Sequence, residues 1–78
     1  MARFYFDIED DRFSITDTDG EELADFEAAR RHAIATAAAV ARDTFPGRAD
    51  GKVAVTVRTE DRTLFEATVR LQTTLHRS

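Results

Sequence analysis

An alanine-rich segment, residues 26–44, constrains the fold of this chain more than any other stretch. Eight of its residues are alanine, which favours helix because it loses no side-chain entropy on folding. Asp25 stands just before the segment, where an aspartate can accept from the free backbone N–H groups of a first helical turn. Pro46-Gly47 follows it, and proline cannot continue a helix. The sequence therefore predicts one helix over residues 26–44.

The predicted helix has one apolar face, and small residues make up most of it. On a helical wheel centred on Ala37, the residues within about 60° of the centre are Phe26, Ala33, Val40 and Ala41, with Ile34 at the edge of that arc. Small side chains let a helix lie close to the layer that it covers. The bulk of the core must then come from that layer.

Arg30 interrupts this apolar face near the start of the predicted helix. In one interpretation its stem packs on the core while its guanidinium group reaches an acidic turn. In the other, the group is partly buried and binds an anion. Arg30 is therefore a candidate anion contact.

The sequence on both sides of the helix alternates between apolar and polar residues, which is typical of half-buried strands. Four strands are predicted, as two hairpins with short turns, over residues 2–8, 12–16, 52–59 and 63–71. Residues 72–78 are predicted to form a tail. The order of elements is therefore β-β-α-β-β.

These elements predict an α+β fold of two layers, in which one helix packs across one face of a four-stranded antiparallel sheet. With 78 residues, the chain is expected to form a single domain, residues 1–78, that is either marginally stable or stabilised by association. The predicted core is Phe4, Phe6, Ile8, Phe13, Ile15, Leu23, Phe26, Ile34, Ala37, Ala41, Val53, Val55, Val57, Phe65, Val69 and Leu71.

The last predicted strand is longer than its neighbour. Its alternation can run on through Thr73 towards Leu75, beyond the reach of the strand at 52–59. An unpaired overhang of this kind can pair with another chain. The alternative is a disordered tail, and the sequence favours neither.

Composition argues against several classes of function. The chain has no cysteine, which excludes disulfides and thiolate metal sites. Its formal net charge of −4 argues against broad electrostatic binding to nucleic acid or to an anionic membrane. No apolar run approaches the length of a membrane span. We therefore expect a cytoplasmic protein that does not contact membranes and has no cofactor.

No group of residues has the pattern of a catalytic or metal site. Asp17-Thr-Asp-Gly20 is similar to the start of a calcium loop, but the twelfth residue is Ala28 where such a loop needs glutamate, so a turn is favoured. The two histidines, His32 and His76, have no patterned nucleophile or carboxylate partner. We expect no catalytic residue and no metal site.

The order Arg3-Phe-Tyr-Phe, an acidic turn, Asp17-x-x-Gly20-x-Glu22-Leu23-x-Asp25 and Ala28-Ala29-Arg30 resembles a family of short, uncharacterised alphaproteobacterial proteins classified as a domain of unknown function. The resemblance extends to the second hairpin, although the turn at residues 60–62 lacks glycine. It implies the same fold and a bacterial, cytoplasmic setting. It implies no activity.

The sheet face away from the helix is the best candidate for a function. Its predicted interaction surface, extended to the end of the last strand, is Arg3, Tyr5, Thr56, Arg58, Leu64, Arg70 and Leu75. We expect a non-enzymatic protein-interaction module, whose partner is another protein or a second copy bound through the open face or the last strand. The alternative is a weak binder of single-stranded nucleic acid, or a regulatory protein, that uses the arginines and Tyr5 of this face.

Overall fold

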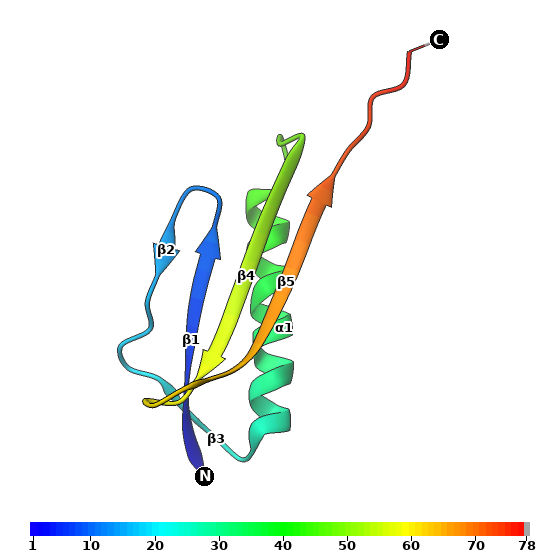
Figure 1. Cartoon of the computed structure of the whole chain (residues 1–78). Coiled ribbons are helices and arrows are strands. Elements are labelled where there is room, and N and C mark those ends of the chain that lie inside the picture. Colours follow the sequence, from blue (N-terminus) through cyan, green and yellow to red (C-terminus); the bar gives the residue numbers. More distant parts are fainter. Residues whose placement is uncertain (78) are drawn as a thin grey trace.

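The computed structural model describes residues 1–77 and contains one sheet with one helix on one of its faces (Figure 1). Its elements in chain order are β1 (Ala2–Asp10), β2 (Ser14–Ile15), β3 (Glu21–Leu23), α1 (Phe26–Thr44), β4 (Asp50–Arg58) and β5 (Thr63–Gln72). The strand order is β2-β1-β4-β5, and β3 pairs with the first residues of β1. Every pair is antiparallel. The predicted α+β class and the helix across an antiparallel sheet are confirmed.

Helix α1 begins and ends where the sequence predicts. The Asp25 carboxylate accepts from the Ala28 N–H at 2.9 Å and so caps the first turn. After the helix, the Arg48 N–H donates to the Phe45 carbonyl at 2.9 Å, across Pro46-Gly47. Gly47 has a φ of 89°, and proline followed by a glycine of positive φ is typical of a type II turn. This turn directs the chain back towards the sheet.

The face that α1 buries is a stripe of alanines at every fourth position. Ala29, Ala33 and Ala37 are 0% exposed, and Ala41 is almost as buried. Opposite them lie the fully buried β4 side chains Val53, Val55 and Val57. Small residues on the helix thus face β-branched residues on the sheet, as the wheel predicts, and the two layers can approach closely.

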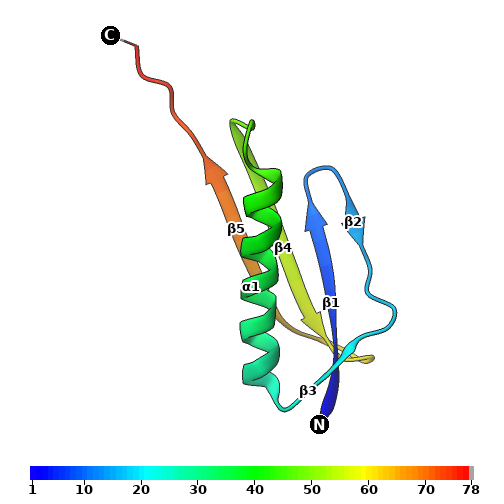
Figure 2. The same cartoon turned by 180° about the vertical axis from the view of Figure 1, so that it is seen from behind.

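Helix α1 lies over β4 and β5 and makes few contacts with β1 (Figure 2). Four residues assigned to the core are therefore exposed: Phe13 at 38%, Ile15 at 53%, Phe26 at 41% and Ile34 at 43%. Their assignment is wrong, because periodicity tells which way a side chain faces but not which part of the sheet the helix covers. The other predicted core residues are buried or partly buried, and the buried residues Tyr5, Ala29, Ala33, Ala54 and Ala67 join them.

The strand bounds differ from the predicted ones at several places. Glu9 and Asp10 belong to β1, and the strand predicted over 12–16 shrinks to β2. The short strand β3 was not predicted. At its start β4 is longer than predicted, so its first residue, Asp50, pairs with Gln72. Gln72 is therefore paired with β4, and the prediction that the last strand runs beyond its neighbour is wrong up to this residue. Residues 73–77 form no strand: the Thr73 hydroxyl donates to the Ala49 carbonyl at 2.6 Å, and the chain beyond it extends away from the sheet. Ser78 of the predicted tail lies outside the described residues.

A buried ion pair joins the loop after α1 to the end of β1. Arg48 Nη2 lies 3.2 Å from Asp10 Oδ1, with side-chain exposures of 11% and 0%. Burial alone would raise the pKa of Asp10, but the Arg12 N–H bond and the Arg48 guanidinium outweigh it and hold that pKa below its ordinary value. Asp10 therefore stays ionised beside its partner and anchors the loop.

Candidate interaction surface

The loop from Asp17 to Gly20 folds back onto β1 through hydrogen bonds with that strand. Asp17 Oδ1 accepts from the N–H groups of Asp19 and Gly20, both at 3.1 Å, and Oδ2 accepts from the Phe6 N–H at 3.1 Å. Arg3 Nη1 donates to the Asp19 carbonyl at 2.8 Å. Within residues 1–77 no three acidic or histidine side chains are grouped to hold a metal ion. The Asp-x-Asp-Gly string is thus a turn whose carboxylate is occupied by backbone donors.

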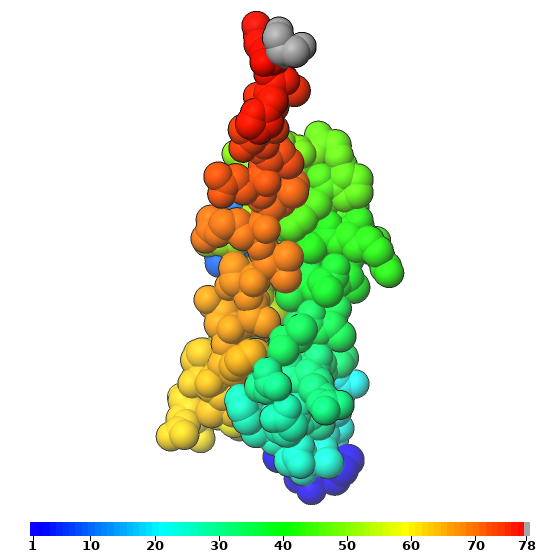
Figure 3. Space-filling view, turned by 90° about the vertical axis from the view of Figure 1, so that its right-hand side faces the viewer, coloured from blue at the N-terminus to red at the C-terminus, as the bar shows by residue number. Residues whose placement is uncertain are grey.

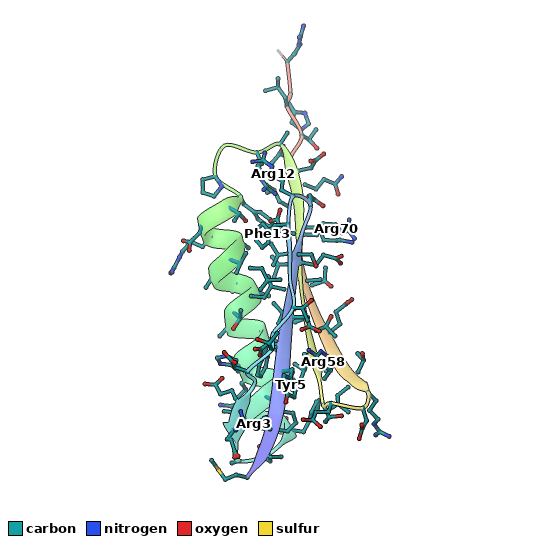
Figure 4. The ribbon with its side chains drawn as sticks, turned by 90° about the vertical axis from the view of Figure 1, so that its left-hand side faces the viewer. Arg3, Tyr5, Arg12, Phe13, Arg58 and Arg70 are labelled. Atoms are coloured by element: carbon teal, nitrogen blue, oxygen red, sulfur yellow. The ribbon has the colours of Figure 1, made fainter. Side chains whose placement is uncertain are left out.

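Arg58 connects this loop to the open face of the sheet. Its Nε donates to Asp7 Oδ2 at 2.7 Å, and its Nη2 donates to the Asp17 carbonyl at 2.8 Å. Its guanidinium carbon lies 4.8 Å from the centre of the Tyr5 ring, a cation–π contact. Tyr5 is only 9% exposed, and its hydroxyl donates to Glu60 at 3.3 Å. Tyr5 and Arg58 lie on the side of the sheet away from α1 (Figure 4).

These contacts also set the ionisation of the cluster. Burial would raise the pKa of Asp7, but its hydrogen bonds with Arg58 and with the Asp17 N–H outweigh burial, so that pKa is lowered. The pKa of Asp17 is lowered as well, because the three backbone N–H donors outweigh the effect of its burial. The hydrogen bond to Asp7 raises the pKa of Arg58. All three groups are therefore charged, and Arg58 together with the backbone N–H donors stabilises the two carboxylates.

The structure thus separates the predicted interaction residues into two groups. Arg3, Tyr5 and Arg58 fasten the loop of residues 17–20 to β1. Since Arg58 lies over the Tyr5 ring and Gly20 packs against its edge, this ring is not an open platform for stacking bases.

The remaining predicted residues lie elsewhere. Thr56 is half-buried and its hydroxyl donates to Glu66 Oε2 at 3.4 Å, while Leu64 packs against the core. Arg70 is exposed on the open face, and Leu75 is 87% exposed beyond β5. Arg30 pairs with Glu27 one turn back on α1, at 3.1 Å, and an anion contact at Arg30 stays a prediction.

A surface that the prediction described only in part is the free edge of β5. This ten-residue strand is the outermost one in the strand order. An antiparallel strand alternates, so that the N–H and C=O of one residue point to one neighbour and those of the next residue point to the other. The N–H groups of Phe6 and Asp10 donate to Asp17 and Phe13, away from β4. Even-numbered residues of β1 therefore face away from β4, and odd-numbered ones face it.

The pairings carry this alternation across the sheet. Odd residues of β1 pair with even residues of β4, so that odd residues of β4 face β5. These pair with odd residues of β5, as Val55 does with Ala67 and Val53 with Val69. The even residues of β5 beyond the irregularity at Val57/Arg58 thus turn their N–H and C=O groups to the free edge. They are Glu66, Thr68, Arg70 and Gln72.

Apolar residues of α1 and β5 flank this edge on the helix side, where the two elements run side by side (Figure 3). The exposed ring of Phe26 lies 6.0 Å from that of Phe65, centre to centre. Further along, a shallow hollow is lined by Ala38, Phe45 and Leu71 among others. Ile34 lies between these two points along α1. We call Phe26, Ile34, Ala38, Phe65 and Leu71 the β5 flank.

Glu66, Thr68 and the β5 flank were not predicted from the sequence to form an interaction surface. Their signal is present in the chain: Glu66 and Arg70 are opposite charges four residues apart on one face of the last strand. Ile34 stands at the edge of the apolar arc of the helix. Neither signal identifies an edge until the strand order is known.

The geometry defines a small α+β protein of two layers with an open antiparallel sheet. Residues 3–70 match the family described as domain of unknown function DUF6894, and the chain belongs to that family. No curated protein and no solved structure matches the chain. No helix within residues 1–77 is both long enough and apolar enough to cross a membrane.

Proposed function

We propose that this protein is a non-catalytic, cytoplasmic interaction module that takes an extended polypeptide segment onto the free edge of β5. The observation that carries the proposal is the row of backbone N–H and C=O groups that Glu66, Thr68, Arg70 and Gln72 turn away from β4. Backbone groups of this kind bind an added strand through main-chain hydrogen bonds.

The composition of β5 supports this assignment. Natural edge strands often discourage pairing with other chains by being very short, by containing proline or a β-bulge, or by carrying charged side chains. Strand β5 has ten residues and contains neither proline nor glycine. The β5 flank adds apolar surface beside the edge, where side chains of an added strand can pack. The open face of β1 offers less, since its arginines and Tyr5 are engaged with the Asp17–Gly20 loop.

Two variants at Thr68 test the proposal. Thr68→Pro removes the free N–H in the middle of the edge, whereas the bonds of β5 to β4 come from odd-numbered residues and remain. Thr68→Val keeps the N–H and the branched shape and serves as the matched control. Both variants are used with the wild type as baits in cross-linked co-purification from the native host, and thermal unfolding verifies that each is folded.

We expect a partner captured by the wild type and by Thr68→Val to be absent with Thr68→Pro. With that partner purified, amide hydrogen exchange at residues 66, 68 and 70 should slow in the complex, because those N–H groups become hydrogen-bonded. Equal capture by both variants, or unchanged exchange at those amides, would show that partners bind elsewhere.

A further inference from the structure

We infer that the segment added to this edge is β5 of a second copy, paired antiparallel about a twofold axis that passes at Thr68. The inference rests on the proposed function and names the partner. Four properties of the edge lead to it: its charges, its backbone groups, its helix-side residues and the position of α1.

The charges of β5 complement each other only between two copies. Glu66 and Arg70 lie on the same face of the strand, about 13 Å apart at the usual rise per residue, too far for a contact within one chain. Neither forms an ion pair within residues 1–77. The neighbour of Arg70 on β4 is Lys52, a like charge directly opposite. A carboxylate on the free side of Arg70 would relieve that repulsion.

Pairing Thr68 with Thr68 of the second copy supplies this carboxylate. Glu66 then faces Arg70 of the second copy, and by symmetry the same pair forms again on the other side of the axis. A shift of two residues puts Leu64 or Thr68 opposite Arg70, and a shift of four puts like charges opposite each other. The charges therefore select one register.

The backbone and the helix-side residues agree with this register. Glu66, Thr68 and Arg70 all face the free edge, so the three central pairs can form about six hydrogen bonds between the copies. On the helix side, Phe65 meets Leu71 of the second copy, and Ala67 meets Val69. All four are apolar, and all are at least partly buried in one copy already.

The position of α1 completes the interface. The helix lies over β4 and β5, and neighbouring strands are about 4.8 Å apart, so joining the two β5 edges puts the two helix axes about 10 Å apart. Helices pack at interaxial distances of about 8–10 Å. Ile34 lies roughly halfway between the helix positions that flank Phe65 and Leu71, at the level of Thr68. Ile34 therefore meets Ile34 of the second copy near the axis, which accounts for an isoleucine that is 43% exposed in one copy.

Charge reversal tests the register. Sedimentation equilibrium of the purified protein should show a reversible dimer. Glu66→Arg or Arg70→Glu alone converts both attractive contacts into repulsive ones and should weaken the dimer about ten- to a hundredfold. The double variant E66R/R70E restores both contacts and should recover the affinity. An equimolar mixture of the two single variants should form a heterodimer of about wild-type affinity, since every Glu then faces an Arg.

Controls separate the interface from folding. Each variant is compared with the wild type by circular dichroism and thermal unfolding. Glu9→Arg reverses the charge of an exposed side chain on β1, away from the free edge of β5, and should leave the affinity of the dimer unchanged. The inference is overturned by a monomeric wild type, or by a dimer whose affinity the single reversals do not change. It is also overturned if the double variant or the mixture fails to recover affinity.

The outcome also separates this inference from the proposed function. If the purified protein is a monomer but Thr68→Pro abolishes binding of another polypeptide, the edge is an interaction site and only its occupant is wrong. If the protein dimerises and neither Thr68→Pro nor the charge reversals affect it, both the edge and the inferred partner are wrong.

Discussion

Gly20 is the position where the structure allows a substitution to be predicted most sharply. It has a φ of 72°, in the region that other residues rarely adopt. A Cβ added there would lie 2.9 Å from Arg3 Cγ and from Tyr5 Cε2, and 3.1 Å from the Phe4 carbonyl oxygen. Gly20→Ala therefore incurs two costs, one from the backbone and one from the overlap.

The magnitudes of the two costs come from different sources. A residue with a Cβ in the left-handed region costs about 1–2 kcal/mol. Overpacking against atoms that cannot all move costs about a further 1–3 kcal/mol. Alanine also lowers the entropy of the unfolded chain, but this gain, about 0.4–1 kcal/mol, applies equally to any Gly→Ala change and cancels in a comparison.

Gly47→Ala is the matched comparison. Gly47 has a φ of 89°, but no atom lies within 4 Å of the Cβ that alanine would add. Gly47→Ala should therefore incur the backbone cost alone. The free energy of unfolding from urea titrations should therefore fall by about 1–3 kcal/mol more for Gly20→Ala than for Gly47→Ala. Each kcal/mol corresponds to a fall of about 4–8 °C in Tm for a domain of this size.

A second observable locates the damage. The chain has one tyrosine and no tryptophan, so its tyrosine fluorescence reports on Tyr5 alone. If the Asp17–Gly20 loop covers Tyr5, acrylamide should quench this fluorescence more strongly in Gly20→Ala than in Gly47→Ala. Equal losses of stability, together with unchanged quenching in both variants, would refute the packing of this loop against Arg3 and Tyr5.

Three further predictions concern the core and the polar cluster. Ala33 is fully buried under the sheet, so Ala33→Val should lower the free energy of unfolding by about 1–3 kcal/mol. Ala35→Val, on the exposed side of α1, should lower it by only about 0.5 kcal/mol. Similar losses for the two variants in urea titrations would show that α1 does not lie close to β4. Asp17→Asn puts an amide where three N–H donors converge, and because the pKa of Asp17 is lowered by folding, the stability that this carboxylate contributes is present above about pH 4 and lost as the pH falls through the lowered pKa. The difference between wild type and Asp17→Asn, followed by urea titration across pH, should therefore narrow on acidification, and a constant difference would contradict the assignment. Arg58→Lys keeps the charge but cannot bond Asp7 and the Asp17 carbonyl with one planar group, so Tyr5 should become easier to quench, and quenching equal to that of the wild type would contradict the role of Arg58.

Local signals were sufficient to predict α1. The capping residue Asp25, the alanine content and Pro46-Gly47 all act within a few residues of the helix ends, and the observed helix has the predicted bounds. The central strands were predicted for a similar reason, since the alternating valines of β4 face a buried layer. In these elements the local preference and the global fold agree.

The sequence pattern could not predict which strands of the sheet the helix covers. Phe13 and Ile15 alternate as residues of a buried strand do, but the helix lies over the other half of the sheet and leaves them exposed. Phe26 and Ile34 fail for the same reason on the other side of α1. Whether an apolar face is covered depends on how two layers are placed, which no local period encodes.

The sequence predicted correctly which way Tyr5 and Arg58 face, but not how accessible they are to a partner. The alternation places Tyr5 and Arg58 on the side away from α1, and they lie there (Figure 4). Their burial depends on a loop that returns from residues 17–20 and on a cross-strand partner 51 residues away from Asp7. The burial of Tyr5 and Arg58 therefore depends on contacts between distant segments, which form only when the sheet is assembled.

The residues that carried the resemblance to the family now have a structural explanation. Asp17 and Gly20 form a turn that accepts three backbone bonds and tolerates no Cβ, and Arg3 fastens that turn to β1. Asp25 caps α1. These residues specify the fold, so a shared pattern at these positions predicts a shared fold and says little about partners. The surface that distinguishes members of the family should instead be the edge of β5, where Glu66 and Arg70 form no ion pair within residues 1–77 and Ile34 is 43% exposed. A member with like charges at positions 66 and 70 should not pair with itself in this register. A member in which the two charges are exchanged should form dimers with itself more readily than mixed dimers with this protein.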